Sequence, residues 1–127
     1  MRQATDYSDL KLPEKQQGFL RFFLTKLSVM PNVERVILFG SCAKGTIHKG
    51  SDVDLFIITK EVPTIEEEVY IMSECPPYYQ SDYYLQSDII IKPQDQYDKY
   101  KDEMGMVQKY VELEGIELTG LLQKCSG

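Results

Sequence analysis

Hydrophobic residues recur along the chain with two different spacings, and each spacing predicts a different kind of element. From Pro13 to about Ser28 the apolar positions return every three or four residues, which predicts an amphipathic helix. Two shorter runs rich in branched and aromatic residues, 33–39 and 52–59, predict strands. A small-residue turn and a loop with several basic residues separate these two runs, with a short helical turn expected at 41–44 and capped by Ser41.

The second half of the chain alternates in the same way. Thr64 and the three glutamates that follow predict a helix that begins there and ends before Pro76. A strand over 83–92, helices over 94–104 and 105–114, and a short edge strand at 116–118 are expected after it. Because helices and strands alternate, the pattern predicts one domain over residues 1–127, an α+β fold with a sheet covered by helices. Residues 1–12 are polar, and we expect them to be loosely held.

The composition restricts the function. Twenty acidic against 14 basic residues give a formal net charge of -6, which argues against binding to long nucleic acids. The three cysteines, Cys42, Cys75 and Cys125, have no ligand-like spacing and predict neither a disulfide framework nor a zinc site. Without an apolar run of membrane-spanning length or a signal-peptide pattern, a soluble cytoplasmic protein is expected, with no membrane partner.

Two carboxylates open the second strand. Side chains two positions apart on a strand share one face, so Asp52 and Asp54 are expected to point the same way, about 6.5 Å apart along the strand. Such a pair can ligate a hard cation such as Mg²⁺. The alternative is two solvated acids on an exposed strand, but like charges on one face repel each other, and a metal would remove that cost.

The turn before this strand can hold a phosphate. Gly40 lets a phosphate approach the backbone, and the Ser41 hydroxyl can donate to it. Lys44 is a candidate phosphate-pairing residue, with a solvated loop lysine as the alternative. His48, the only histidine, is interpreted as a bystander, and Cys42 as a packing residue.

Gly40-Ser41, ten intervening residues and then Asp52-x-Asp54 together resemble the signature of the DNA polymerase beta-like nucleotidyltransferase superfamily. With Ala43, Gly45 and Ser51 also in place, the chain resembles the minimal nucleotidyltransferases in particular. Asp88, which opens an apolar strand, matches the third carboxylate of that family. Glu114-Gly115-x-x-Leu118 resembles its closing segment, so the resemblance covers residues 14 to 120.

The resemblance implies a palm-like fold, a mixed sheet flanked by helices. It implies one or two Mg²⁺ ions on the catalytic carboxylates Asp52, Asp54 and Asp88, with Asp88 also acting as general base. It further implies a nucleoside triphosphate, expected to be ATP, on the nucleotide-binding residues Gly40, Ser41, Lys44 and Ser51. Asp82 shares the parity of Asp88 but lies too far along an extended strand for both to reach the metal. The family often has arginine at the positions of Cys42 and Lys44, which predicts a weaker grip on the triphosphate.

The leading hypothesis is transfer of a nucleoside monophosphate, AMP from ATP, to a hydroxyl acceptor. The catalytic fold uses nearly all of this sequence, so we expect a partner protein to supply the acceptor, and the resemblance suggests a HEPN-type toxin. One alternative is a non-catalytic, antitoxin-like binding subunit, and another is an adenylyltransferase that acts on a small molecule. Five tyrosines near the third strand predict a partner or homodimer surface: Tyr70, Tyr78, Tyr79, Tyr83 and Tyr84.

Overall fold

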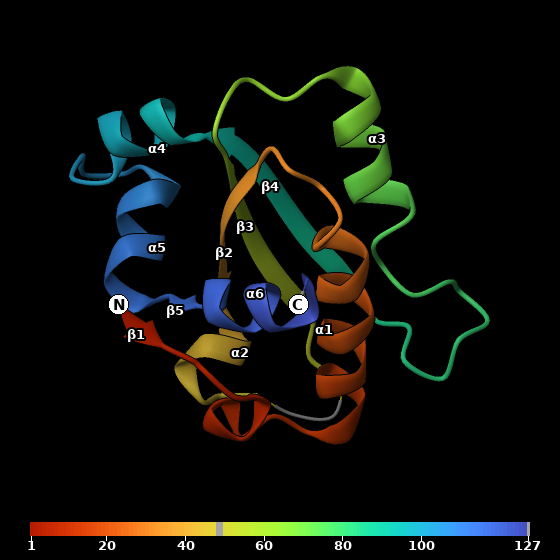
Figure 1. Ribbon diagram of the computed structural model, residues 1–127. Coiled ribbons are helices and arrows are strands. Elements are labelled where there is room, and N and C mark those ends of the chain that lie inside the picture. The colour runs from red at the N-terminus through yellow and green to blue at the C-terminus, as the bar shows by residue number, and fades with distance from the viewer. Residues whose placement is uncertain (48–49, 127) are drawn as a thin grey trace.

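A mixed five-stranded sheet forms the centre of the protein (Figure 1). The computed structural model describes residues 1–47 and 50–126. The strands are β1 (Arg2–Gln3), β2 (Val33–Phe39), β3 (Val53–Thr59), β4 (Ser87–Pro93) and β5 (Ile116–Glu117). Their order is β1-β5-β2-β3-β4, with β1·β5 and β3·β4 parallel and β5·β2 and β2·β3 antiparallel. The predicted α+β class with a mixed sheet is confirmed.

Helices cover both faces of this sheet. They are the 3₁₀ helix η1 (Tyr7–Leu10), α1 (Glu14–Leu27), α2 (Ser41–Lys44), α3 (Ile65–Ser73), α4 (Gln94–Tyr100), α5 (Val107–Glu114) and α6 (Thr119–Ser126). The larger core lies on one face and contains residues of α1, α3, α6 and the first twelve residues. The smaller core lies on the other face, where Tyr97 of α4 and Val111 of α5 pack against β2 and β3. In Figure 1, α4 and α5 lie to the left of the sheet and α1 and α3 to the right.

The elements of the first half agree closely with the sequence pattern. Helix α1 and strands β2 and β3 begin and end within about one residue of their predicted limits. Thr64 caps α3 as predicted, accepting from the Glu67 amide while the Glu67 carboxylate accepts from the Thr64 amide. Local capping chemistry and periodicity were sufficient here because each acts within one or two turns.

Several local features differ from the prediction. Helix α4 ends at Tyr100 and not at residue 104, and helix α5 begins at Val107 and not at residue 105. Residues 83–86 are not strand, since β4 begins at Ser87. The residue that caps α2 is Gly40 rather than Ser41. The segment 116–117 is an internal strand, because β1 pairs on its outer side and forms the edge instead. Helix α6 was not predicted: it is short and carries a glycine, so packing rather than propensity stabilises it.

The first twelve residues are more structured than their polar composition predicts. Strand β1 pairs with β5, and η1 begins with a capping box formed by Asp6 and Asp9. Ala4, Leu10 and Leu12 are buried in the larger core. Three apolar side chains spread over a polar segment give no periodic signal, so only the tertiary contacts reveal this anchoring.

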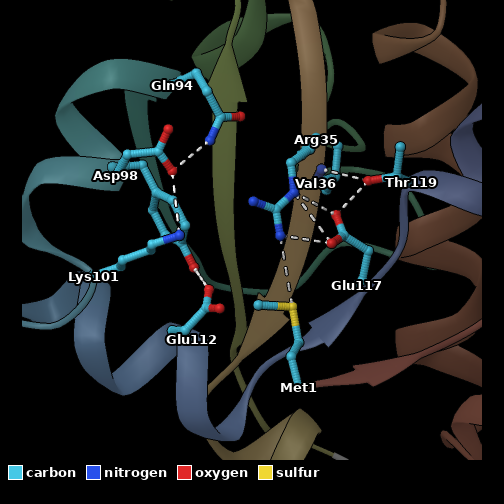
Figure 2. A network of polar contacts seen from close by, with 10 residues as sticks. Met1, Arg35, Val36, Gln94, Asp98, Lys101, Glu112, Glu117 and Thr119 are labelled. Carbon is cyan, nitrogen blue, oxygen red and sulfur yellow. Dashed lines mark hydrogen bonds and ion pairs between the residues drawn. The ribbon is translucent and has the colours of Figure 1, made fainter.

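An ion pair joins β5 to β2 (Figure 2). Arg35 of β2 donates to Glu117 of β5 through Nη2 at 2.7 Å and through Nε at 3.1 and 3.2 Å to the two carboxylate oxygens. Glu117 also accepts from the Thr119 hydroxyl, which in turn accepts from the Val36 amide. The Arg35 guanidinium lies 5.4 Å from the Tyr97 ring centroid. These contacts bind the closing segment to the sheet.

Replacing Glu117 with glutamine should lower the free energy of unfolding by about 2 kcal/mol, because it leaves the half-buried Arg35 without its counter-charge. Loss of one partner from a fully buried ion pair would lower the stability more, but the Arg35 side chain is 27% exposed to solvent. Urea denaturation measures the change. The exposed pair Lys101–Asp98 is the matched control, and Lys101→Met should cost less than about 0.5 kcal/mol. Equal losses in the two variants would contradict the prediction.

No helix in the described part of the chain has the length and apolar character needed to cross a membrane.

Candidate active site

One row of the sheet brings together residues that are far apart in sequence. Phe39 of β2 is the register partner of Asp54 in β3, and Asp54 is the register partner of Asp88 in β4. Register partners on neighbouring strands point to the same face and lie about 4.8 Å apart. The carboxylates of Asp54 and Asp88 are therefore neighbours on one face of the sheet, with the Phe39 ring beside them.

The electrostatics of Asp54 reflect this crowding. Its carboxyl is half-buried, and partial desolvation is the main cause that raises its pKa above the ordinary value. The neighbouring charge of Asp88 is the second cause and that of Asp52 the third. Asp54 therefore ionises less readily than a solvated aspartate. A bound cation would reverse this effect by neutralising the repulsion.

The turn after β2 is shaped around the same carboxylate. Gly40 has φ +74° and ψ -153°, a conformation that side chains with a Cβ rarely adopt. A Cβ at this position would also overlap the Asp54 Oδ2 atom. The backbone of the Gly40-Ser41 turn thus lies directly against Asp54. This close approach joins the predicted phosphate turn to the predicted metal ligand.

Cys42 lies inside the protein and holds the two halves of the motif together. Its side chain is 3% exposed, and its Sγ donates to the Asp52 carbonyl oxygen at 3.3 Å. Burial, with smaller contributions from Asp54 and Asp52, raises the pKa of this thiol to about 12. A neutral, buried thiol neither attacks a substrate nor binds a metal as thiolate. The burial of this neutral thiol agrees with the packing role predicted for Cys42.

Lys44 reaches across to helix α5. Its Nζ lies 3.6 Å from Glu114 Oε2 and 4.9 Å from the Tyr110 ring centroid. These two groups raise its pKa, Tyr110 more than Glu114, so Lys44 is a cation at any physiological pH. The side chain is 44% exposed. Lys44 therefore has protein partners of its own as well as open access to solvent at the mouth of the turn.

The remaining predicted nucleotide-binding residues occupy different environments. Ser41 is partly exposed at the start of α2. Ser51 is buried, and its carbonyl oxygen accepts from Gln16 Nε2 at 3.1 Å, which anchors the end of the loop to helix α1. His48 and its neighbour Lys49 lie outside the described residues. The sequence did not single out Gln16, although a glutamine on the apolar face of a helix is a signal of a buried polar contact.

Carboxylates of this kind suit Mg²⁺, which prefers oxygen ligands. Asp54 and Asp88 lie adjacent in register, whereas Asp52 is exposed and lies one residue before β3 begins. Among the described residues, no three His, Cys, Asp or Glu side chains are gathered as a ready-made metal site. Mg²⁺ commonly binds through one or two carboxylates together with substrate phosphates rather than in an all-protein cage. The donor set and the mutual repulsion at Asp54 therefore fit a divalent cation that takes its remaining ligands from outside the protein.

The tyrosines of the predicted partner surface separate into two groups. Tyr70 donates its hydroxyl to the Lys26 carbonyl oxygen and packs against the larger core. Tyr78, Tyr79 and Tyr83 are 57%, 79% and 40% exposed in the segment between α3 and β4. This segment projects from the body at the right of Figure 1. Asp82 lies in the same segment, and not on a strand beside Asp88.

Comparison with known proteins identifies the class. The family model described as "Polymerase beta, Nucleotidyltransferase" matches residues 24–118, so the chain belongs to the polymerase beta nucleotidyltransferase family. The resemblance to minimal nucleotidyltransferases inferred from the Gly-Ser and Asp-x-Asp motif is thereby confirmed. Nucleotidyl transfer is the type of reaction that this family defines.

One curated protein and one solved structure are similar to this chain. A Methanocaldococcus jannaschii protein named "Putative protein adenylyltransferase" is 44% identical over 61 residues, which are 48% of this chain and 57% of that protein. The match thus spans little more than half the length of this curated relative. A crystal structure titled "putative nucleotidyltransferase", from Sulfolobus solfataricus, has 25% sequence identity and a TM-score of 0.44, with coverage of 72% of this chain and 85% of that chain.

Proposed function

We propose that this protein transfers AMP from ATP to a hydroxyl group of a partner protein, with Mg²⁺ as cofactor. The observation that carries the proposal is the placement of Asp54 beside Asp88, directly against the Gly40 turn. One glycine-serine turn and two neighbouring carboxylates provide a phosphate site and a cation site in contact. That combination is what phosphoryl-group chemistry requires, because positioning and charge neutralisation supply most of the catalysis.

Each residue has a role in this proposal. Gly40 leaves the backbone open to the triphosphate, and Ser41 donates to a phosphate oxygen. Lys44 adds positive charge at the edge of the turn, and Ser51 closes the loop. Asp54 and Asp88, with Asp52 at the margin, hold Mg²⁺, which when bound neutralises negative charge on the phosphate oxygens.

In the proposed reaction one bond to the α-phosphorus forms while another breaks, and Asp88 takes up the released proton. The acceptor hydroxyl oxygen forms a bond to the α-phosphorus, and the bond from that phosphorus to the bridging oxygen of the pyrophosphate breaks. Asp88 accepts the proton of the attacking hydroxyl, as its exposed position next to Asp54 allows. Pyrophosphate leaves with the electrons of the broken bond.

The name of the Methanocaldococcus relative supports a protein as the acceptor. We propose a HEPN-type toxin as that protein, silenced by the modification, so that the nucleotidyltransferase acts as the antitoxin. The exposed tyrosines before β4 are the proposed contact surface for this partner or for a second copy of the chain. Free thiols at Cys42 and Cys75 suit a reducing, cytoplasmic compartment.

Intact mass spectrometry tests the proposal. The protein is incubated with Mg²⁺, each nucleoside triphosphate in turn, and the protein encoded beside it in the genome. A mass gain of one or more AMP units on the partner, with ATP only and dependent on Mg²⁺, is expected. A tight complex without any mass gain would instead support the non-catalytic antitoxin. If an aminoglycoside-like small molecule added to the mixture is modified and the partner gains no mass, the result would support an adenylyltransferase that acts on a small molecule.

A further inference from the structure

An apolar pocket opens beside the carboxylate row, on the same face of the sheet. It has a volume of about 680 Å³, within the range of small-molecule sites. Strand β2 supplies one wall and helix α5, with the residues before it, supplies the other. Its main lining residues are Phe39, Met106, Val107, Lys109, Tyr110 and Leu113.

Phe39 connects this pocket to the proposed chemistry. It is the register partner of Asp54 and the residue immediately before Gly40. Phe39 therefore belongs both to the wall of the pocket and to the row of the sheet that carries Asp54 and Asp88.

Tyr110 connects the pocket to the phosphate turn from the other side. Its ring packs edge-on against Phe39, with centroids 6.4 Å apart and planes at 82°. The Lys44 ammonium lies over the same ring. The pocket thus has an aromatic lining at its centre, and cations Lys44 and Lys109 at its borders.

We infer that this pocket holds the base of the nucleotide substrate. A nucleotide carries a planar apolar ring at one end and a polyanion at the other. The pocket supplies aromatic and aliphatic contacts for the ring, and Lys44 of the adjoining turn supplies positive charge for the polyanion. An apolar side chain of a protein acceptor would fill the pocket but would make no use of the neighbouring lysines. This inference rests on the proposed function and adds the site that selects the base.

Two substitutions test the pocket with little risk to the fold. Leu113 is 66% exposed, and Leu113→Gln removes apolar contact without adding charge or a poor helix former. Tyr110→Leu removes the aromatic ring but keeps an apolar side chain at this position. Met72→Gln is the matched control, since Met72 is a similarly exposed apolar residue on α3 (52% exposed), on the other side of the sheet in Figure 1.

Calorimetric titrations with ATP and with inorganic triphosphate, both with Mg²⁺, give the readout. In the unsubstituted protein ATP should bind at least about tenfold more tightly than triphosphate, which corresponds to one stacked base. Leu113→Gln and Tyr110→Leu should each remove most of this difference and leave triphosphate affinity within about twofold. Met72→Gln should change neither affinity.

The outcomes separate this inference from the proposed function. Equal affinities for ATP and triphosphate in the unsubstituted protein, or an ATP preference that survives both pocket substitutions, would overturn the base site and leave the proposed transfer intact. Pocket variants that retain ATP binding but lose the partner protein would assign the pocket to the acceptor instead. Binding of neither ATP nor triphosphate would overturn both proposals.

Discussion

Replacing Asp54 with asparagine is expected to abolish nucleotidyl transfer and, at neutral pH, to raise the free energy of unfolding. The change is nearly isosteric and removes the negative charge on which the proposed cation site depends. Loss of electrostatic stabilisation at this position should lower the rate on the order of a thousandfold. Transfer to the partner protein, followed by intact mass, measures the rate.

The gain in stability follows from the sign of the pKa shift. The pKa of Asp54 is raised in the folded chain, so the folded state holds this proton more tightly than the unfolded state does. Stability therefore falls as pH rises from the ordinary aspartate value of 3.8 through the raised pKa, and above it the cost of the ionised group is fully present. Asparagine never carries this cost. Thermal unfolding as a function of pH should show the variant more stable above that window.

The same carboxylate determines the expected pH dependence of activity. Because binding of the cation needs ionised Asp54, the rate at sub-saturating Mg²⁺ should fall as the solution is acidified through the raised pKa of the metal-free protein. Mg²⁺ should raise the melting temperature of the unsubstituted protein with ATP present, and should not do so in Asp54→Asn. Asp102→Asn is the control, since Asp102 is an exposed acid in the turn after α4, away from both the carboxylate row and the tyrosines before β4, and its substitution should affect neither property. An active Asp54→Asn variant would falsify the assignment of this residue.

Replacing Gly40 with alanine is expected to damage both folding and activity. The backbone conformation at φ +74° disfavours any residue with a Cβ, which costs about 2 kcal/mol in the free energy of unfolding. The added methyl group would also push against the Asp54 carboxylate and displace it from Asp88. We expect a loss of transfer of at least about a hundredfold, since small displacements of reacting groups have effects of this size.

Gly45→Ala measures the cost of a positive φ at a position where the added methyl group has room. Gly45 also has a positive φ, +79°, but a Cβ there would meet open space. Its substitution should therefore cost about 1 kcal/mol, from conformation alone. Chemical denaturation compares the two variants. A cost at Gly40 no larger than that at Gly45 would show that the Asp54 contact contributes nothing to the stability of the turn.

Asp54 and Gly40 both lower the stability of the fold at the candidate site. A half-buried carboxylate next to another carboxylate is unfavourable in the protein alone, and Gly40 has to leave room for it. Neither feature stabilises the fold. Sites that sacrifice stability in this manner are characteristic of function, because the missing favourable interaction comes from the ligand.

Local sequence determined the elements from which the site is built. Helix α1, strands β2 and β3 and the Thr64 cap follow from periodicity and capping over a few residues, and these interactions join residues that are close in sequence. The Gly40-Ser41 and Asp52-x-Asp54 motifs could be recognised for the same reason, since both lie within one strand-turn-strand unit. Cys42 could be read as a packing residue from its isolation from any base.

Tertiary structure alone decided how distant segments meet. The sequence proposed Asp88, but the parallel register of β3 and β4 is what sets it beside Asp54, and that register depends on side-chain packing across the whole sheet. Insertion of β5 between β1 and β2 and the formation of α6 likewise depend on contacts with residues more than seventy positions away, such as the pair of Arg35 and Glu117. The approach of Tyr110 to Lys44 and Phe39 has no local signal in the sequence, because helix α5 and the Gly40-Ser41 turn are far apart along the chain and meet through their packing on the sheet. The sequence thus determined the chemistry of the site, and the packing of the sheet determined which groups share it.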